Sequence, residues 1–245
     1  MPIKKQTLDR LISGYAEWKS WSPDAAPIPQ FSVYSEEIAR AKLLSGARIL
    51  EIGFGEGAFL DWAQDQGFLC TGLEINPELV ESARARSHDV HRGTLHDAFP
   101  SGENIFDAVV LFDVLEHILL DDILLLFDDL RNLLRPDGKV IARFPNGASP
   151  FGRAYQYGDA THISVLTGSL MAQIGMATGF DLIGQYNAAR GKKSHGGGLR
   201  NFWLVRRIAF ALRDIIQVPL SLIYYGKNIP MDPNITVILQ KRKYS

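Results

Sequence analysis

Short apolar runs alternate with helical patterns along the chain from residue 48 onward. Each run is bounded by glycine, proline or polar residues, as strands are. The runs that predict strands are residues 48–52, 68–73, 107–112 and 139–144. Helical spacing of apolar residues occurs between them, over residues 58–66, from Asn76-Pro77 onward and over residues 124–134. The run 107–112 has no polar alternation, which indicates a strand buried on both faces.

Strand and helix in alternation predict a doubly wound α/β fold. Parallel strands need crossover connections, and right-handed crossovers place helices on both faces of the sheet. We therefore expect a Rossmann-like, mostly parallel sheet. Ligands of such sheets bind at the carboxyl ends of the strands, so the residues that follow each strand are the first candidates for function.

The first 45 residues have a different pattern. They predict one or two amphipathic helices around the segment 21–29, whose prolines at positions 23, 27 and 29 interrupt any continuous helix. We expect residues 1–45 to form an N-terminal helical cap and residues 46–245 to form the main domain.

The composition is that of a globular protein, with 46% hydrophobic residues and 26 Lys and Arg against 27 Asp and Glu. It excludes disordered and collagen-like classes. A single cysteine, Cys70, excludes an internal disulfide and a four-thiolate zinc site, and predicts a reducing, cytoplasmic compartment. The first residues lack the apolar run of a signal peptide.

The charges are unevenly distributed along the chain. Residues 1–189 hold 15 Lys and Arg against 25 Asp and Glu, whereas residues 190–245 hold 11 against 2. This asymmetry predicts that the C-terminal quarter meets something anionic. The alternative is that a basic edge only balances an acidic body.

A glycine-rich loop, residues 51–57 (EIGFGEG), follows the first predicted strand. Glycines at a strand-to-helix junction let the backbone approach a ligand and permit positive φ. Glu74 ends the next strand, where a carboxylate can accept hydrogen bonds from a ribose diol. The loop also fits the loose dinucleotide pattern, but the carboxylates of Glu51 and Glu56 favour a cationic ligand over a pyrophosphate. The sequence thus predicts a nucleoside site.

Four motifs follow one another over roughly residues 45–145: residues 51–57, Glu74, residues 106–117 (FDAVVLFDVLEH) and residues 134–139 (LRPDGK). In order and spacing they resemble the class I S-adenosylmethionine-dependent methyltransferases. The resemblance implies S-adenosylmethionine as cofactor, methyl transfer as activity and an antiparallel final strand. The acidic loop then has a physical meaning, because this cofactor carries a sulfonium and an ammonium group.

The resemblance also implies which residues touch the cofactor. Gly53, Gly55 and Gly57 would line its methionine portion, Glu51 would stand near its amino group, and Glu74 would hold the ribose hydroxyls. Further cofactor contacts are expected from Phe54, Ile75, Thr94, Leu95, Asp113 and His117, with Thr94 and Leu95 at the adenine. The family often places an acidic residue there, and Asp97 is the nearest one unless it only caps a loop. For His117 we expect cofactor contact or positioning, the alternative being a polar lid on the following helix.

The segment 145–168 follows the predicted strand 139–144, where such enzymes build their acceptor pocket. Asp159 and His162 are three residues apart, so the carboxylate can orient the imidazole. The stretch resembles the Asp-x-x-His segment of methyltransferases of bacterial surface-polysaccharide (O-antigen or capsule) biosynthesis. We expect His162 and Asp159 to be the catalytic residues, with His162 a general base or acceptor-binding group. The residues expected to shape the acceptor pocket are Asn146, Tyr155 and Tyr157. The alternative is a structural histidine that closes the loop.

Three further histidines, His88, His91 and His96, crowd one stretch of the chain. Their spacing matches neither a zinc helix motif nor a carboxylate cage, and no cysteine accompanies them. We expect them to be surface residues, and no metal site is predicted.

An insertion, residues 187–233, separates the last two predicted strands, 180–186 and 234–240, which the resemblance pairs antiparallel. Hairpin loops have about 2–5 residues, so the insertion is a feature of its own. Its first part, residues 190–200, is basic and glycine-rich and is expected to close over an anionic acceptor.

Residues 206–225 of the insertion are apolar, but Arg213, Asp214 and Pro219 interrupt them and argue against a transmembrane span. Three arrangements stay open for residues 200–226. They lie on an anionic membrane surface, pack on a partner subunit of a homo-oligomer, or cap the protein's own core. Capping the core is the default for an apolar stripe.

These patterns predict a methyltransferase that acts on an oxygen of a saccharide or saccharide-phosphate, in the cytoplasm or at the inner face of the membrane. Its closest rival is a methyltransferase of another small molecule, such as a quinone, because one core serves many acceptors. Two further candidate classes are an NAD(P)-dependent oxidoreductase, which Glu51 and Glu56 disfavour, and a non-catalytic cofactor-binding subunit. A nucleic-acid substrate is disfavoured, because residues 113–116 lack the Pro-Pro-aromatic motif of base amino-methylation.

Overall fold

The structure, a computed structural model, describes Trp18, residues 31–100, Gly102, and residues 104–190, 200–226 and 228–243. Most of the predicted N-terminal cap and most of the glycine-rich segment 190–200 lie outside the described residues. The part of the cap that is described is helix α3, Phe31–Ala41.

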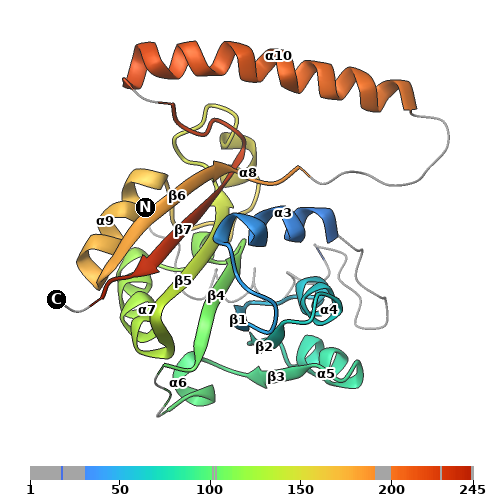
Figure 1. Ribbon diagram of the computed structural model, residues 1–245, viewed down its shortest axis with the longest axis vertical. Coiled ribbons are helices and arrows are strands. Elements are labelled where there is room, and N and C mark those ends of the chain that lie inside the picture. Colours follow the sequence, from blue (N-terminus) through green and yellow to red (C-terminus); the bar gives the residue numbers. More distant parts are fainter. Residues whose placement is uncertain are drawn as a thin grey trace.

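A seven-stranded sheet forms the centre of the molecule, in the order β3-β2-β1-β4-β5-β7-β6 (Figure 1). Neighbouring strands from β3 to β5 are parallel, and β7 is antiparallel to both β5 and β6. This arrangement confirms the predicted Rossmann-like fold. The strands are β1 (Arg48–Ile52), β2 (Leu69–Glu74), β3 (Asp89–Arg92), β4 (Phe106–Phe112), β5 (Leu134–Pro145), β6 (Phe180–Asn187) and β7 (Asn234–Lys241).

Helices cover both faces of the sheet (Figure 1). In chain order after α3, they are α4 (Ala58–Asp65), α5 (Pro77–Ala85), α6 (Leu95–Ala98), the 3-10 turn η1 (Leu115–His117), α7 (Leu120–Leu133), α8 (Arg153–Tyr157), α9 (Gly168–Thr178) and α10 (Arg200–Tyr225). Successive residues of β1 point into different cores, Ile49 toward α3 and α4 and Leu50 toward α7 and α9. Central strands buried on both faces explain why their sequences are continuously apolar.

Helix α5 begins as the sequence predicts. The side chain of Asn76 accepts hydrogen bonds from the backbone amides of Glu78 and Leu79, and Pro77 occupies the first turn. The N-cap fixes where β2 ends, and therefore where the Glu74 carboxylate lies.

One predicted strand boundary is wrong. The pattern placed a strand at residues 139–144, but the corresponding strand, β5, already begins at Leu134. Leu134 pairs with Phe106, and the register then shifts before Ala108 pairs with Lys139. The residues between Leu134 and Lys139 form the irregularity, and regular pairing with β4 resumes at Lys139.

Helix α10 occupies the insertion between β6 and β7 and runs across one end of the molecule (Figure 1). The helix lies beyond the carboxyl end of β5. This placement is shown by a cavity of about 560 Å³ that is lined both by α10 residues and by residues that follow β5. Parallel strands place their ligand sites at this edge, so α10 stands on the side of the sheet that carries the candidate site.

Candidate active site

The glycine loop after β1 has the backbone shape that its sequence predicts. Gly53, Gly55 and Gly57 have φ angles of +70°, +55° and +79°. A Cβ on Gly53 would lie 2.8 Å from Cγ2 of Val114, so a larger residue would be strained by both its φ and its surroundings. The loop therefore presents bare backbone at the carboxyl end of β1.

Glu74 lies beside this loop, at the end of β2. Its Oε2 accepts a hydrogen bond from the amide of Gly55 at 3.1 Å. Its Oε1 accepts from the amides of Ile75 and Asn76, at 2.8 and 3.0 Å. The carboxylate is thus held in one orientation, as a ribose-binding acceptor requires.

Glu51 is a buried carboxylate at the same edge of the sheet. Burial raises its pKa well above the ordinary value, and the nearby Glu74 carboxylate adds to that shift. Its Oε2 has no hydrogen-bond partner among the residues that the structure describes. A cationic group placed beside Glu51 would supply the missing partner, which is the property expected of the amino group of S-adenosylmethionine.

The expected adenine contacts fit less well. Thr94 and Asp97 form a capping box at α6, in which the Thr94 amide donates to Asp97 at 2.9 Å. This local bonding lowers the pKa of Asp97, through the backbone amide first. Leu95 is buried in the core, so its side chain does not face a ligand. The alternative role of Asp97 as a cap is confirmed, whereas Ile75 is exposed at the end of β2 and available for contact.

Two other expected cofactor residues have structural partners. Phe54 is buried against Leu60 and Leu79, so only its backbone is offered to a ligand. Asp113 has a φ of +59° and forms an ion pair with Arg143, the guanidinium of which lies over the ring of Phe112. The ion pair fixes the turn that leads from β4 into η1.

The predicted catalytic residues meet in a compact cluster. Nε2 of His162 lies 3.6 Å from Oδ2 of Asp159 and 4.0 Å from Oε1 of Glu116. Oδ1 of Asp159 accepts hydrogen bonds from the amide and the hydroxyl of Thr161. The rings of His117 and His162 meet edge to face with centroids 4.7 Å apart. The Asp159 carboxylate therefore lies beside the imidazole that it was expected to orient.

Glu116 is a member of this cluster that sequence reasoning missed. It is buried, and its backbone carbonyl accepts hydrogen bonds from the amides of Ile163 and Ser164. These bonds join η1 to the acceptor-side segment and bring His162 beside His117. The adjacent pair Glu116-His117 was the available signal, because both follow the end of β4.

The same cluster has a geometry that a divalent cation could use. One ligand atom from each of Glu116, His117 and His162 lies within 4.8 Å of the others. Carboxylate and imidazole are common ligands of such ions. This grouping was not foreseen, since the sequence predicted no metal site.

The residues expected to line the acceptor pocket have different environments. Tyr155 and Tyr157 are exposed on α8. Asn146 is buried, donates to the carbonyls of Pro230 and Asp232, and accepts from the amide of Ala148. The structure thus gives Asn146 an anchoring role for the segment before β7.

His88 was expected at the surface, and this expectation is wrong. Its side chain is only 6% exposed, and Nε2 lies 2.6 Å from Oδ1 of Asp61. The contact joins α4 to the segment before β3. His91 packs against the ring of Phe99, and His96 is exposed.

The fold and the pairing of a glycine loop with Glu74 are those of the class I S-adenosylmethionine-dependent methyltransferases. Comparison with known proteins agrees, since residues 29–185 match the methyltransferase domain family. The match spans more than half of the 245 residues, and the chain belongs to this family. Membership argues against an NAD(P)-dependent oxidoreductase.

Curated relatives share part of this chain. The ubiquinone biosynthesis O-methyltransferase of Xylella fastidiosa (strain M23) is 28% identical over 148 residues, which are 56% of this chain and 58% of that protein. The chain therefore spans little more than half the length of this relative.

Solved structures share the fold. A SAM-dependent methyltransferase from Archaeoglobus fulgidus superimposes with a TM-score of 0.64 at 16% identity, covering 94% of this chain and 99% of the other. The 1,6-didemethyltoxoflavin-N1-methyltransferase of Burkholderia thailandensis, solved with bound S-adenosylhomocysteine, superimposes with a TM-score of 0.61 at 15% identity. The superposition covers 99% of this chain and 93% of the other. S-adenosylmethionine is the cofactor of this class, and the bare glycine loop, the oriented Glu74 and the unpartnered Glu51 oxygen fit it.

Proposed function

We propose that this chain is an S-adenosylmethionine-dependent O-methyltransferase in which His162 accepts the proton of the acceptor hydroxyl. The bound cofactor supplies an electrophilic methyl group. The chain's own residues hold the acceptor oxygen about 3 Å from that group and remove its proton.

The observation that carries the proposal is the environment of His162. Nε2 faces the Asp159 carboxylate at 3.6 Å, while Nδ1 is buried and has no hydrogen-bond partner among the described residues. A carboxylate beside Nε2 favours the tautomer with its proton there, which leaves a lone pair on Nδ1. Asp159 also stabilises the imidazolium that forms when Nδ1 takes a proton.

For the acceptor we propose a hydroxyl of a saccharide or saccharide-phosphate, in the cytoplasm. The support is the Asp159 and His162 pair and its resemblance to polysaccharide-linked methyltransferases. A second candidate is the phenolic hydroxyl of a quinone precursor, and the match to a ubiquinone biosynthesis O-methyltransferase favours it.

Two measurements test the class of enzyme and its acceptor. Calorimetry should detect S-adenosylhomocysteine binding and no NADH binding, and tight binding of NADH alone would overturn the proposal. Methyl-labelled cofactor is then supplied with a sugar-nucleotide and glycolipid extract, and separately with polyprenylated phenols. Label in the first pool supports the saccharide, and label only in the second replaces it with the phenol.

The base is tested by His162→Ala and Asp159→Asn. For His162→Ala we expect turnover at saturating acceptor to fall about 10²–10⁴-fold, with the acidic limb of the pH–rate profile lost and cofactor affinity unchanged. Asp159→Asn should lower turnover less, since the imidazole remains. His96→Ala is the matched control, because His96 is exposed and outside the cluster. Unchanged turnover in His162→Ala would remove His162 from catalysis.

A further inference from the structure

Helix α10 is oriented with its polar side chains toward the protein. Gln217 and Ser221, one turn apart, are 8% and 0% exposed. Ile215 and Ile223, on other faces of the helix, are 68% and 75% exposed. An amphipathic helix of a soluble protein normally buries its apolar stripe against the core, so α10 is reversed.

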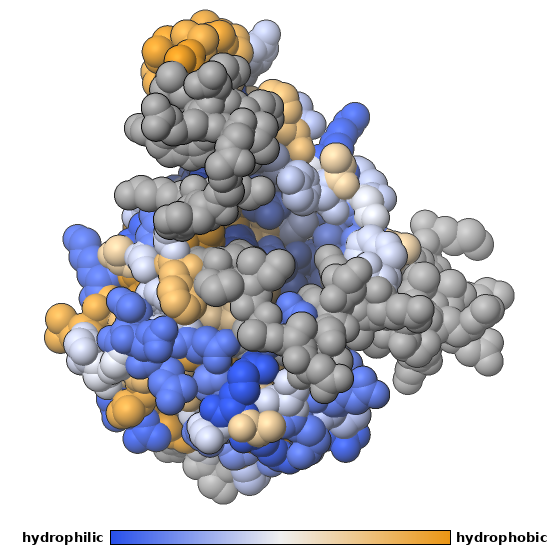
Figure 2. All heavy atoms as spheres, turned by 90° about the vertical axis from the view of Figure 1, so that its right-hand side faces the viewer, coloured by the Kyte–Doolittle hydropathy of each residue, from blue (hydrophilic) through white to orange (hydrophobic). Residues whose placement is uncertain are grey.

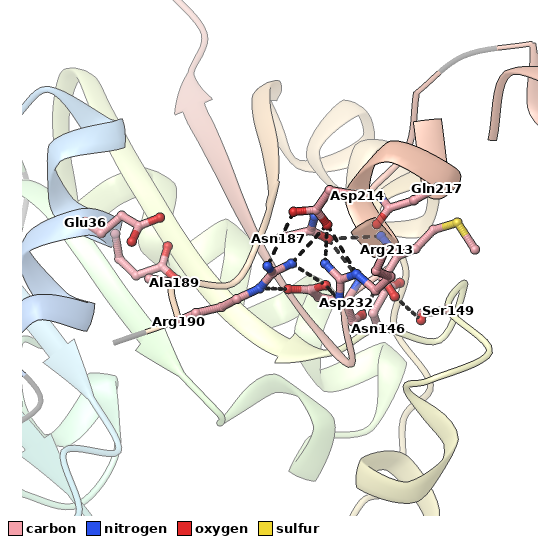
Figure 3. A network of polar contacts seen from close by, with 12 residues as sticks. Glu36, Asn146, Ser149, Asn187, Ala189, Arg190, Arg213, Asp214, Gln217 and Asp232 are labelled. Carbon is pink, nitrogen blue, oxygen red and sulfur yellow. Dashed lines mark hydrogen bonds and ion pairs between the residues drawn. The ribbon is translucent and has the colours of Figure 1, made fainter. Parts of the chain in front are cut away.

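A network of ion pairs and hydrogen bonds supplies partners for the polar side chains on the inner face of α10 (Figure 3). Arg190, at the end of the segment after β6, donates to both oxygens of Asp232, at 2.7 and 2.8 Å. Arg213 of α10 forms ion pairs with Asp232 and with its neighbour Asp214. The ring of Phe210 packs against the guanidinium of Arg190. These contacts hold the middle of α10 parallel to the protein surface.

The C-terminal half of α10 is held in the same way. The Gln217 side chain donates to the carbonyl of Ile229 at 3.1 Å, and the Ser221 hydroxyl lies 3.3 Å from Oδ1 of Asn228. Both partners belong to the segment that leads into β7. The middle and the C-terminal half of the helix are thus attached through polar groups.

The outward face of α10 is apolar. In Figure 2 the helix is the orange element at the top of the molecule. The exposed large apolar side chains on this face are Ile208, Leu212, Ile215, Ile216, Val218, Leu222 and Ile223. Leu220, Tyr224 and Tyr225 are exposed too, but they line the cavity between α10 and the segment after β5. The default expectation that this stretch caps the protein's own core is wrong for the described side chains.

Residues Ile208–Tyr225 are long and apolar enough to span a membrane by length and composition, and only 11% of that window is buried. The ion pairs of Arg213 and Asp214 argue for a different placement. A span would carry these charges into the hydrocarbon, whereas in the structure they face Asp232 and Arg190. Held flat, the 18 residues Ile208–Tyr225 span about 27 Å along the helix axis.

We propose that α10 is an interfacial helix that docks this protein onto an anionic membrane surface. The outward apolar side chains would enter the headgroup and acyl boundary, as those of such helices do. Charge favours an anionic surface, because residues 190–245 hold 11 Lys and Arg against 2 acidic residues, which leaves an excess of positive charge after Arg190 and Arg213 pair with Asp214 and Asp232. A second copy of the chain would meet the same positive charge, which disfavours it as the occupant.

Docking through α10 would also orient the candidate active site. The cavity of about 560 Å³ lies between α10 residues such as Leu220 and Tyr224 and the segment 147–150 after β5. Because Leu220 and Tyr224 are exposed on the helix that docks, the acceptor-side segment across the cavity would lie next to the bilayer. The docking itself requires no particular acceptor.

The test is sedimentation of the full chain with lipid vesicles. We expect binding to vesicles of phosphatidylglycerol mixed with phosphatidylcholine, weakened by high salt, and much weaker binding to phosphatidylcholine alone. The double variant Ile215→Gln, Ile223→Gln should bind the anionic vesicles at least about tenfold more weakly, since each isoleucine buries an apolar side chain. The matched control is Leu125→Gln, Met176→Gln, because both residues are exposed on helices elsewhere.

Calorimetry with S-adenosylhomocysteine reports whether each variant is folded, independently of vesicle binding. No binding of the folded wild-type protein to anionic vesicles would overturn the proposal, as would equal binding of both double variants. If light scattering shows a dimer that only the α10 variant disrupts, and vesicles are not bound, the outward face belongs to a second copy. Failure of methyl transfer with every acceptor would contradict the proposed function and leave this result unaffected.

Discussion

The Glu74 carboxylate at the end of β2 accepts a hydrogen bond from the amide of Gly55 in the loop after β1, at 3.1 Å. Two adjacent parallel strands are joined here by a side chain and a glycine with positive φ. Because the backbone amides at the end of β2 also bind this carboxylate, it is oriented before any ligand arrives. Such preorganisation lowers the cost of binding a ribose.

Replacing Glu74 should therefore weaken cofactor binding without unfolding the protein. A hydrogen bond to a charged group contributes about 1.5–3 kcal/mol. We expect Glu74→Ala to bind S-adenosylhomocysteine about 10- to 100-fold more weakly by calorimetry. The control is Glu81→Ala, which removes a carboxylate from the exposed side of α5. An unchanged affinity in Glu74→Ala would contradict the ribose assignment.

Cofactor binding should depend on pH through Glu51. Burial raises the pKa of this carboxyl in the free protein, and a cationic ligand beside it would lower that pKa again. Binding then releases a proton, so affinity rises with pH until Glu51 is ionised in the free protein. Calorimetry in buffers of different ionisation enthalpy measures the release, and Glu51→Gln should abolish it. If Glu51→Gln released as many protons on binding as the wild-type protein, the proton would come from a group other than Glu51.

The same shift has a consequence for stability. The native pKa of Glu51 lies above the unfolded value of about 4.3. The native state therefore holds the proton more tightly, and this group's contribution to stability falls as pH rises from the unfolded to the folded pKa. In thermal melts without cofactor, Glu51→Gln should gain stability over wild type as pH rises through that window. A constant difference across pH would contradict the buried, ionising carboxyl.

Much of the part that carries the expected cofactor site was predictable from the sequence, because the signals there are local. Strand length, the glycines at 53, 55 and 57 and the N-cap at Asn76 depend on neighbouring residues. Contacts between distant segments were not predictable. Glu116 meets His162 only through the fold, and His88 is buried only because Asp61 of α4 faces it.

The orientation of α10 was also beyond sequence reasoning. An apolar stretch of 18 residues normally signals burial, and nothing local shows that Gln217 and Ser221 form the inner face. The reversal depends on Arg190 and Asp232, which flank the helix in sequence and bind its middle. The periodicity of a sequence shows which residues share a face of a helix, but it does not show which face packs against the rest of the protein.

Glu37 of α3 should be a major source of stability. Its buried carboxylate accepts hydrogen bonds from the Thr236 hydroxyl and the Ala189 amide and pairs with Arg40. Glu37→Ala should cost about 3 kcal/mol in urea unfolding, because buried partners lose their acceptor. Glu36 pairs with the same Arg40 but is half exposed, so Glu36→Ala should cost less than about 1 kcal/mol. Equal losses would show that burial does not set the difference.

Chelation distinguishes two uses of the Glu116, His117 and His162 cluster. If His162 accepts a proton through Nδ1, turnover should not change after metal is removed with EDTA, because no ligand atom of the base is occupied by an ion. We expect this result, measured on protein whose metal content is checked by mass spectrometry. Loss of turnover that a divalent cation restores, together with loss of that cation in Glu116→Gln, would assign these ligand atoms to a metal instead. His162 would then be a ligand, and the acceptor proton would have to leave through another group.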